Sequence, residues 1–291
     1  MTITLAPPRP GQTLLLHVEH AEVELPGSYR EYEVETRIAE GNFGEVYRAR
    51  EKLSGQEVAL KILKREWLTD AQAVARFRRE AEVLARLTHA NVIRVYNFGR
   101  YGPSFFMALE LMDGPTLEAR MAERGIWPVG EALAHGIAVL RGLEAVHAAG
   151  IVHRDVKPSN VACLEGRLVI FDFGLAIGQD MSRLTLSGSF LGTPQYAAPE
   201  QAVGQPTTGA SDVYAAGVIL YQLLSGRLPH EADSVFGILH KKADEDPVPL
   251  AEHRADLPRA VLGAVDKMLE REAAKRPSAA AAAKMLEEAR G

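Results

Sequence analysis

Residues 151–175 read IVHRDVKPSNVACLEGRLVIFDFGL, and this stretch decides how the rest of the chain is interpreted. Two short apolar runs lie in it, residues 161–164 and 168–171, with residues 165–167 (Glu-Gly-Arg) between them. Short apolar runs separated by a glycine-containing turn predict a β-hairpin. We therefore expect a hairpin in the middle of the chain, with polar residues just before and just after it.

Three of those polar residues are Asp155, Asn160 and Asp172. Two carboxylates and an amide at this spacing suit a divalent cation together with phosphate. Hard cations such as Mg²⁺ prefer oxygen ligands and usually keep phosphate oxygens in their coordination shell. Scattered, solvated acidic residues at the ends of a hairpin are the plainer alternative.

The order of these residues resembles a known family. The triplet His-Arg-Asp at 153–155, then Asn160, then the triplet Asp-Phe-Gly at 172–174 resemble the catalytic loop and metal-binding turn of the eukaryotic-type protein kinases. The wording of residues 192–201, GTPQYAAPEQ, is most similar to bacterial serine/threonine kinases of this type, the Hanks type. Either triplet alone could arise by chance, but both in this order make chance a poor explanation.

The resemblance implies an α+β, two-lobed protein-kinase-like fold. Its small N-lobe is a mainly antiparallel β-sheet with one helix, called helix C, and its larger C-lobe is mainly α-helical. On this basis we expect an N-terminal extension over residues 1–31, the N-lobe and hinge over 32–112, and the C-lobe over 113–291, with the catalytic domain at about 32–286.

Composition limits the function further. The 291 residues are 47% hydrophobic and 24% charged, which is ordinary for a globular protein large enough for two lobes. A net charge of −5 gives no electrostatic support for nucleic-acid binding. The single cysteine, Cys163, excludes an internal disulfide and fits a reducing compartment, so a cytoplasmic location is expected. We expect neither a signal peptide nor a membrane segment, because no apolar run approaches the roughly 18 residues that a span needs.

The N-terminal extension has a pattern of its own. Residues 1–11 are rich in proline and are expected to be extended. Apolar residues alternate over residues 14–18 and again, in the opposite phase, over 21–25, which predicts one or two strands. An added edge strand and a regulatory or dimerising role both remain open.

Residues 32–50 alternate like strands around a glycine-containing turn. Gly41 and Gly44 have no Cβ, so the backbone can approach phosphate oxygens closely. The turn resembles the kinase glycine-rich loop, with Phe43 at its tip covering the phosphates. It departs from the pattern at Ala39, where the first glycine is expected, and this change is expected to stiffen the loop or shift nucleotide affinity.

The next strand is predicted at residues 57–62 and contains one lysine, Lys61. By resemblance Lys61 holds the α and β phosphates and Glu80 pairs with it; a solvated edge charge is the alternative for Lys61. Glu80 could instead pair with Arg76 on its own helix. Glu82 is a rival partner for Lys61, but it lies about 200° around the helix from Glu80, so both cannot face the lysine.

The helix that carries Glu80 has a predicted start. Thr69 and Gln72 resemble a capping box, which predicts a helix from there to about Leu87.

The resemblance also assigns the nucleotide-contacting residues. Val46 and Ala59 form the roof of the adenine pocket, Leu109 lies at its back, and Ala162 is a smaller floor than the family usually has. The complete set is Ile38, Ala39, Gly41, Phe43, Gly44, Val46, Ala59, Lys61, Leu109, the hinge residues Glu110, Leu111 and Met112, and Ala162.

The catalytic roles follow from the matching motifs. By resemblance, Asp155 accepts or orients the proton of the substrate hydroxyl, and Lys157 stabilises the charge of the transferring γ-phosphoryl. Asn160 and Asp172 hold Mg²⁺ or Mn²⁺, and Lys61 positions ATP.

Five further residues are assigned supporting roles by the same resemblance. His153 packs under Phe173 and is structural rather than a general base. Asp212, which opens a helix that is apolar nearly all round, holds the backbone of the catalytic loop. Arg276 pairs with Glu200 of the Ala-Pro-Glu motif, and a surface charge is the alternative for Arg276.

Residues 176–191 show no strong periodicity, and loops of this length are usually functional or disordered. We expect activation by phosphorylation at Thr185 or Ser187, with Arg154 pairing with the phosphate. Constitutive activity is the alternative. Residues 192–200 resemble the segment that docks protein substrates.

Together these residues predict a serine/threonine protein kinase that transfers the γ-phosphoryl group of ATP to proteins. Lys157 and Thr193 are the serine/threonine form of their motifs. The expected partners are protein substrates and a second copy of the chain, which would phosphorylate the activation loop in trans, with a homodimer as one option. A pseudokinase scaffold and a small-molecule phosphotransferase are the two alternatives.

Overall fold

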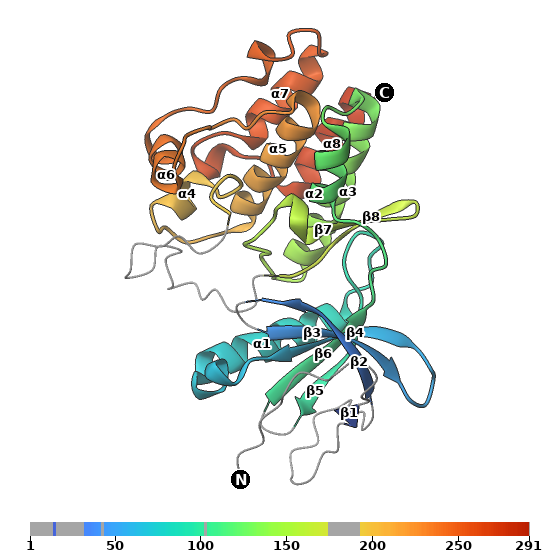
Figure 1. The fold of residues 1–291 in the computed structure, drawn as a ribbon. Helices are drawn as coiled ribbons and strands as arrows, with labels where there is room; N and C mark the ends of the chain where they lie inside the picture. Colours follow the sequence, from blue (N-terminus) through green and yellow to red (C-terminus); the bar gives the residue numbers. More distant parts are fainter. Residues whose placement is uncertain (1–13, 16–31, 42–43, 102–103, 174–192, 291) are drawn as a thin grey trace. The chain divides into compact units, whose positions relative to one another are not determined.

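The computed structural model describes residues 14–15, 32–41, 44–101, 104–173 and 193–290 (Figure 1). The chain divides into two compact units. The first, which we call the strand unit, is Met1–Thr88 with Ile93–Asp113. The second, the helical unit, is His89–Val92 with Gly114–Gly291.

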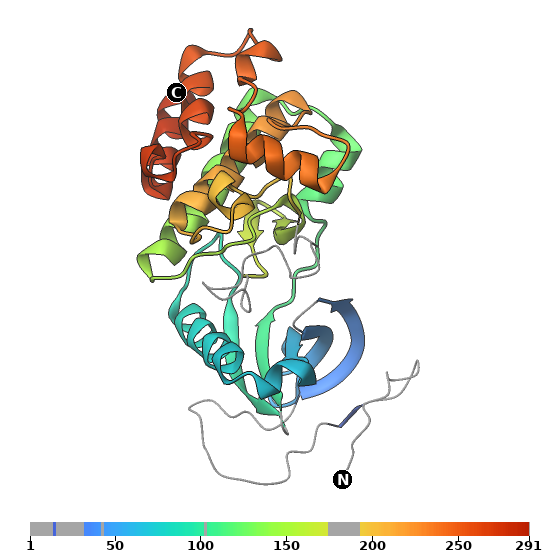
Figure 2. The same cartoon turned by 90° about the vertical axis from the view of Figure 1, so that its left-hand side faces the viewer.

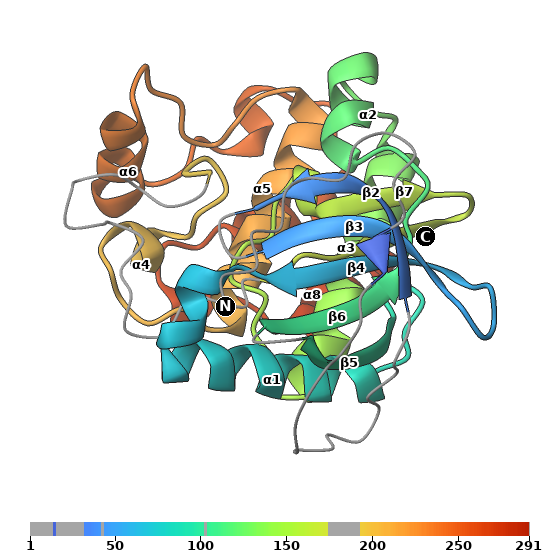
Figure 3. The same cartoon turned by 60° about the horizontal axis from the view of Figure 1, so that its bottom comes forward.

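The strand unit contains a six-stranded sheet in the order β1-β2-β3-β4-β6-β5, with every neighbouring pair antiparallel. Figure 3 looks onto this sheet and shows β2, β3, β4, β6 and β5 side by side. The strands are β1 (Leu14–Leu15), β2 (Tyr32–Glu40), β3 (Gly44–Glu51), β4 (Glu57–Leu63), β5 (Val95–Tyr101) and β6 (Ser104–Glu110).

One face of the sheet buries an apolar cluster. Because side chains alternate between the two faces of a strand, every second residue of β2, β3, β4 and β6 reaches the same side. Tyr32 and Phe106 meet edge to face there, with ring centroids 5.8 Å apart. The cluster consists of Tyr32, Val34, Ala49, Val58, Leu60, Phe106 and Ala108.

Strand β1 is an edge strand at the N-terminus. Leu14 pairs with Val34 and Leu15 with Glu33. The rest of the alternation predicted for the N-terminal extension lies outside the described residues.

Helix α1 (Ala71–Arg86) follows a short 3₁₀ turn, η1 (Arg65–Thr69), and contacts β5 (Figures 2 and 3). Its buried residues are spaced at helical intervals: Ala73, Phe77, Ala81 and Leu84.

The predicted cap of this helix was wrong by one residue. Thr69 ends the 3₁₀ turn, where its hydroxyl donates to the carbonyl of Glu66. Asp70 is the N-cap instead, because one of its carboxylate oxygens accepts from the amides of Gln72 (2.9 Å) and Ala73 (3.1 Å).

The helical unit begins with α2 (Leu117–Arg124) and α3 (Val129–Ala148), followed by the 3₁₀ turn η2 (Pro158–Asn160) and the hairpin of β7 (Val161–Leu164) and β8 (Arg167–Ile170). The remaining elements are α4 (Pro199–Ala202), α5 (Gly209–Ser225), α6 (Val235–Asp244), η3 (Leu250–Glu252), α7 (Arg259–Met268), η4 (Ala273–Lys275) and α8 (Ala279–Arg290).

Helix α5 lies in the core of this unit. It contacts α3, α7 and α8, and α3 in turn contacts α8 (Figure 1). Nearly all of its residues are buried, which confirms the prediction from its continuous apolar sequence. The predicted hairpin is confirmed as β7 and β8, paired from Val161–Ile170 to Leu164–Arg167.

The segment His89–Val92, between α1 and β5, belongs to the helical unit. The Asn91 side-chain amide donates to the carbonyl of Leu168 (2.8 Å), and the Asn91 carbonyl accepts from the amide of Ile170 (3.0 Å). A Cβ on Gly142 of α3 would lie 2.7 Å from that carbonyl oxygen. A glycine at this position is therefore what lets helix α3 approach the segment.

None of the helices in the described ranges is long and apolar enough to cross a lipid bilayer.

The corrected cap yields a test. Replacing Asp70 with alanine leaves two helix-terminal amides without their acceptor, so Asp70→Ala should lower the free energy of unfolding by about 1 kcal/mol. Thr69→Ala is the matched control and should cost clearly less. Urea unfolding of the two variants beside the wild type measures the difference, and equal losses would argue against Asp70 as the cap.

Candidate active site

The loop before η2 is held by one buried carboxylate. Asp212, near the start of α5, is 1% exposed and accepts hydrogen bonds from the amides of His153 and Arg154, both at 2.8 Å. His147, in the last turn of α3, contacts the same carboxylate through Nε2 at 2.7 Å. A buried charge is tolerated only when its hydrogen bonds are satisfied, and here three donors do so.

The loop needs such an anchor because its backbone is unusual. Arg154 has a φ of +69°, in the left-handed region that side chains other than glycine rarely adopt. A residue in this region costs of order 1 kcal/mol or more unless its surroundings fix it. The two amides that point at Asp212 belong to Arg154 and its neighbour, so the carboxylate fixes the backbone at the strained residue.

Just after this bend, three polar side chains meet. Lys157 Nζ lies 2.8 Å from Asp155 Oδ2. The side-chain amide nitrogen of Asn160 donates to the Asp155 carbonyl (2.8 Å) and to Asp155 Oδ2 (3.1 Å). The cluster therefore joins a carboxylate, an ammonium group and an amide within one short loop, and we call it the Asp155 cluster.

His153 is buried directly behind this cluster. Its Nε2 is 3.0 Å from the carbonyl of Phe171, so Nε2 carries the proton and donates. Its Nδ1 then accepts from the amide of Asp155 (3.3 Å), and its ring lies 4.5 Å from that of Phe173. Both ring nitrogens are engaged within the protein, an arrangement that suits a structural residue better than a general base.

The β7–β8 hairpin connects the cluster with Asp172. Val161 pairs with Ile170, and one step further out the amide of Phe171 donates to the carbonyl of Asn160 (3.0 Å). Asn160 directly precedes β7 and Asp172 follows β8, so both residues lie at the open end of the hairpin. Asp172 also has a positive φ, +55°, which turns the chain sharply after β8.

This end of the hairpin fits a hard divalent cation. The Asn160 amide nitrogen is committed to Asp155, which turns the carbonyl oxygen Oδ1 away from that contact. Asn160 and Asp172 thus provide an amide oxygen and a carboxylate, the ligand types that Mg²⁺ takes. The donor set therefore fits the predicted metal.

In the strand unit, the predicted nucleotide-contacting residues share one face of the sheet. Lys61 in β4 pairs with Val46 in β3 and with Met107 in β6, and Ala59 pairs with Leu109. Residues directly opposite in antiparallel strands point to the same side. This side is opposite to the apolar cluster, because Lys61 and Ala59 alternate with cluster residues along β4.

The glycine-rich turn joins β2 and β3. The amide of Gly41 donates to the carbonyl of Gly44 (2.9 Å), and Ala39 pairs with Val46. A Cβ on Gly44 would lie 2.6 Å from the carbonyl oxygen of Ile62, so the close approach of β4 itself requires glycine there. Gly44 thus has a packing role that the sequence motif does not indicate.

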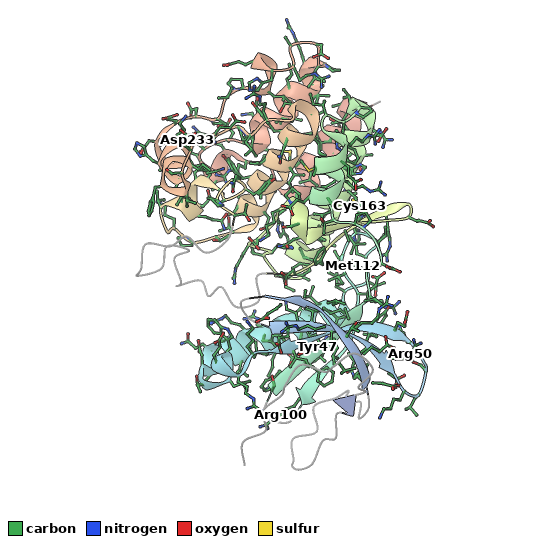
Figure 4. The ribbon with its side chains drawn as sticks, viewed as in Figure 1. Tyr47, Arg50, Arg100, Met112, Cys163 and Asp233 are labelled. Atoms are coloured by element: carbon green, nitrogen blue, oxygen red, sulfur yellow. The ribbon has the colours of Figure 1, made fainter. Side chains whose placement is uncertain are left out.

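The remaining predicted nucleotide-contacting residues lie on several elements. Ile38 is half exposed near the end of β2, and Glu110 ends β6, where its amide donates to the carbonyl of Arg94 (2.9 Å). Leu111 and Met112, the latter labelled in Figure 4, follow it in the strand unit. Ala162 is buried in β7 of the helical unit.

The predicted site is therefore divided between the two units. Lys61 belongs to the strand unit, whereas Asp155, Asn160 and Asp172 belong to the helical unit. That the two groups surround one nucleotide stays a prediction. Phe43, Thr185, Ser187 and the side chain of Glu80 lie outside the described residues, so the Lys61–Glu80 pair and the phosphorylation sites also stay predictions.

The Ala-Pro-Glu segment is fixed by a buried ion pair. Both carboxylate oxygens of Glu200 accept from Arg276 at 2.8 Å, and the Ser211 hydroxyl donates to Glu200 Oε1 at 2.6 Å. Burial alone would raise the pKa of Glu200. The hydrogen bonds and charge of Arg276, together with Ser211, outweigh burial and hold the pKa below its ordinary value.

Sequence reasoning missed one residue that connects this segment to the catalytic loop. Gln201 is buried; its Oε1 accepts from the amide of Ala198 (2.9 Å) and its Nε2 donates to the carbonyl of Arg154 (3.2 Å). A glutamine in the first turn after a proline is a capping signal that could have indicated it. Its long-range contact with Arg154 has no local signature.

Comparison with known proteins now identifies the family. The family model for the protein kinase domain matches residues 32–286. The chain belongs to the protein kinase family. The strand unit is the N-lobe of a kinase, with α1 as helix C, and the helical unit is the C-lobe, which confirms the predicted fold.

Named kinases of bacteria are similar to most of the chain. Serine/threonine-protein kinase pkn3 of Myxococcus xanthus is 38% identical over 259 residues, covering 85% of this chain and 47% of that protein. The probable serine/threonine-protein kinase PknB of Corynebacterium glutamicum is 36% identical over 254 residues, covering 85% of this chain and 39% of the relative. This kinase chain thus spans less than half the length of these relatives.

A solved structure supports the same fold. The PknI kinase domain of Mycobacterium tuberculosis, crystallised as a point mutant, superposes with a TM-score of 0.68 at 28% sequence identity. The match covers 94% of this kinase chain and 100% of the solved chain.

The anchoring role of Asp212 can be tested by removing its charge. Asp212→Asn leaves at least one of the three donors facing an amide nitrogen instead of an oxygen. The free energy of unfolding should fall by about 1.5–3 kcal/mol, the range for hydrogen bonds to charged groups. Asp233, exposed and labelled in Figure 4, is the control, and Asp233→Asn should stay within about 0.5 kcal/mol of wild type. Equal effects in denaturant unfolding would contradict the anchor.

The Glu200–Arg276 pair predicts a pH-dependent effect. The pKa of Glu200 in the folded chain lies below its ordinary value of 4.5. The contribution of this ion pair to the free energy of unfolding is therefore complete above pH 4.5 and is lost as the pH falls through the folded pKa. Glu200→Gln should therefore cost about 3–5 kcal/mol at neutral pH, because it leaves Arg276 buried without its anion. The difference from wild type should shrink in acid. Unfolding measured at about pH 7 and about pH 3 checks this, and a pH-independent difference would argue against it.

Proposed function

We propose that this kinase chain transfers the γ-phosphoryl group of ATP to serine and threonine hydroxyls of proteins, with Mg²⁺ or Mn²⁺ as the cation. The observation that carries the proposal is the Asp155 cluster, anchored by Asp212 in a chain whose relatives are named serine/threonine kinases. Lys157 and Thr193 support serine and threonine as the acceptors.

In this proposal the Asp155 cluster carries out the transfer. Asp155 orients the substrate hydroxyl and accepts its proton, and Lys157, 2.8 Å away, stabilises the negative charge of the transferring group. Asn160 limits the rotation of the Asp155 carboxylate through its hydrogen bond to Oδ2. Rate enhancement then comes from positioning and from charge stabilisation, with no covalent enzyme intermediate.

Asn160 and Asp172 would hold the cation, which supplies positive charge to the phosphate oxygens. Lys61, braced by Glu80, would hold the α and β phosphates. The adenine would lie against the shared face of Val46, Ala59 and Leu109 and bond the hinge backbone, with Ala162 as the floor. The glycine-rich turn, including Gly41 and Phe43, would cover the phosphates.

We further propose that the kinase phosphorylates a second copy of itself at Thr185 or Ser187. Arg154 directly precedes Asp155. A phosphate on the activation loop that pairs with the guanidinium of Arg154 would therefore be connected to the proposed catalytic aspartate through a single residue. Trans-phosphorylation requires two copies of the chain to meet, and a homodimer is one way in which they could do so. A cytoplasmic location belongs to the same proposal.

The test is phosphate transfer from labelled ATP with Mg²⁺ to the chain itself and to a generic basic protein, with mapping of the modified residues. Asp155→Asn should lower kcat by a factor of about 100 or more, equivalent to about 2.7 kcal/mol of transition-state stabilisation. Asp246→Asn, an exposed aspartate of the same unit, is the control and should keep normal turnover.

Near-normal turnover of Asp155→Asn would refute the assignment of the catalytic aspartate. Nucleotide binding without any transfer by the wild type would favour a pseudokinase scaffold. Transfer to small metabolites but not to proteins would favour a small-molecule phosphotransferase.

A further inference from the structure

Helix α6 buries a lysine that has no hydrogen-bonded anion within the described ranges. Lys242 is 0% exposed, and its Nζ has no hydrogen-bond partner in the part of the chain that the structure describes. The Nζ lies over the ring of Tyr214 in α5, 4.9 Å from the centroid. A buried ammonium without a hydrogen-bonded anion is costly, so the surroundings of this amine decide whether it keeps its proton.

The same ring already has a cation next to it. Arg276 Cζ lies 4.8 Å from the centroid of the Tyr214 ring. A carboxylate that acts on the charge of Lys242, Glu200 of α4, is engaged by both terminal nitrogens of Arg276 and by the hydroxyl of Ser211. Arg276 and Ser211 therefore largely compensate the charge of Glu200, which leaves little of it to stabilise a proton on Lys242.

The side chain of His230, which also lies near the amine, is neutral. The Nε2 of His230 donates to the carbonyl of Glu245 at 3.2 Å, and its Nδ1 lies 3.5 Å from the Tyr214 hydroxyl, which can donate to it. Burial, reinforced by the charge of Lys242, lowers the pKa of His230 to about 4, although Glu245 acts in the opposite direction and the neighbouring Lys241 in the same one. The imidazole is thus uncharged near neutral pH and offers Lys242 no anion.

Burial is the main influence on the amine itself. It lowers the pKa of Lys242 from 10.5 to about 7; the charge of Arg276 acts in the same direction, and Glu200 opposes both. Four charged or titratable groups of the described residues therefore lie near the amine: Glu200 of α4, Tyr214 of α5, His230 between α5 and α6, and Arg276 after η4.

We propose that Lys242 makes the packing of helix α6 on the C-lobe sensitive to pH around neutrality, because its buried amine is accommodated without a proton and is poorly accommodated with one. The helix contacts α4, which carries Glu200 and Gln201. Protonation therefore acts next to the segment that, if the proposed kinase function holds, docks protein substrates.

The direction of the effect follows from linkage. In the unfolded chain the amine keeps its proton up to about pH 10.5, whereas in the folded chain it loses it near pH 7. Between these values the unfolded state binds more protons, so the free energy of unfolding rises with pH. Well below pH 7 the amine is charged in both states, and the cost of burying the charge then lowers the free energy of unfolding in full.

A direct titration tests the amine without any assay of kinase activity. The ε-carbon resonances of isotopically labelled lysines, followed by NMR from about pH 6 to about pH 10, should include one with a midpoint near 7. That resonance should be missing in Lys242→Met, or in Lys242→Leu if the methionine variant does not fold. If every lysine of the folded chain titrates near 10.5, the proposal is overturned.

Stability measured over the same pH range gives a second, independent readout. Lys242→Met keeps the length of the side chain but removes the charge. Its unfolding midpoint should lie above that of wild type near pH 6, and the gain should shrink as pH rises to about 10. Lys241→Met, on the adjacent residue of the same helix, is the matched control and should follow wild type throughout. A gain that does not change with pH, or one equal in both variants, overturns the proposal.

Discussion

The carboxylate of Asp212 is the interaction on which the rest of the site depends. Three donors converge on it from the end of α3 and from two successive residues of the catalytic loop. Without this anion the left-handed backbone at Arg154 would lose the acceptor of its own amide and of the amide before it, and Asp155 follows that residue directly. The position of the proposed catalytic carboxylate is therefore set by a charge buried in the C-lobe core.

Buried charge is used repeatedly in this lobe, with different outcomes. Asp212 is satisfied by backbone amides, and Glu200 by a bidentate arginine. Among the residues that the structure describes, Lys242 Nζ has no hydrogen-bond partner; it lies over an aromatic ring, next to which the same arginine also lies. The first two therefore hold the catalytic loop and the Ala-Pro-Glu segment in place, whereas the third is the group that we propose to respond to protons near neutrality.

Much of the fold could be predicted from local patterns. The β7–β8 hairpin and the buried helix α5 follow from runs of apolar residues, because burial on both sides leaves no polar face in the sequence. The cap of α1 was misassigned because Thr69 and Asp70 are adjacent and both residue types cap helices; only the backbone conformation distinguishes them. Gln201 was missed because its partner, Arg154, is 47 residues away in the chain.

The sequence by itself determined the family, the fold class and the identity of the candidate catalytic residues, because these depend on residue types at fixed spacings. The tertiary structure decided which groups contact one another: that Asp212 accepts from three donors, that the carbonyl of Ile62 requires glycine at position 44, and that Lys242 lies over the ring of Tyr214 with no hydrogen-bonded anion in the described part of the chain. These facts depend on contacts between segments far apart in the chain, and the distances that create them are set only when the helices and strands pack.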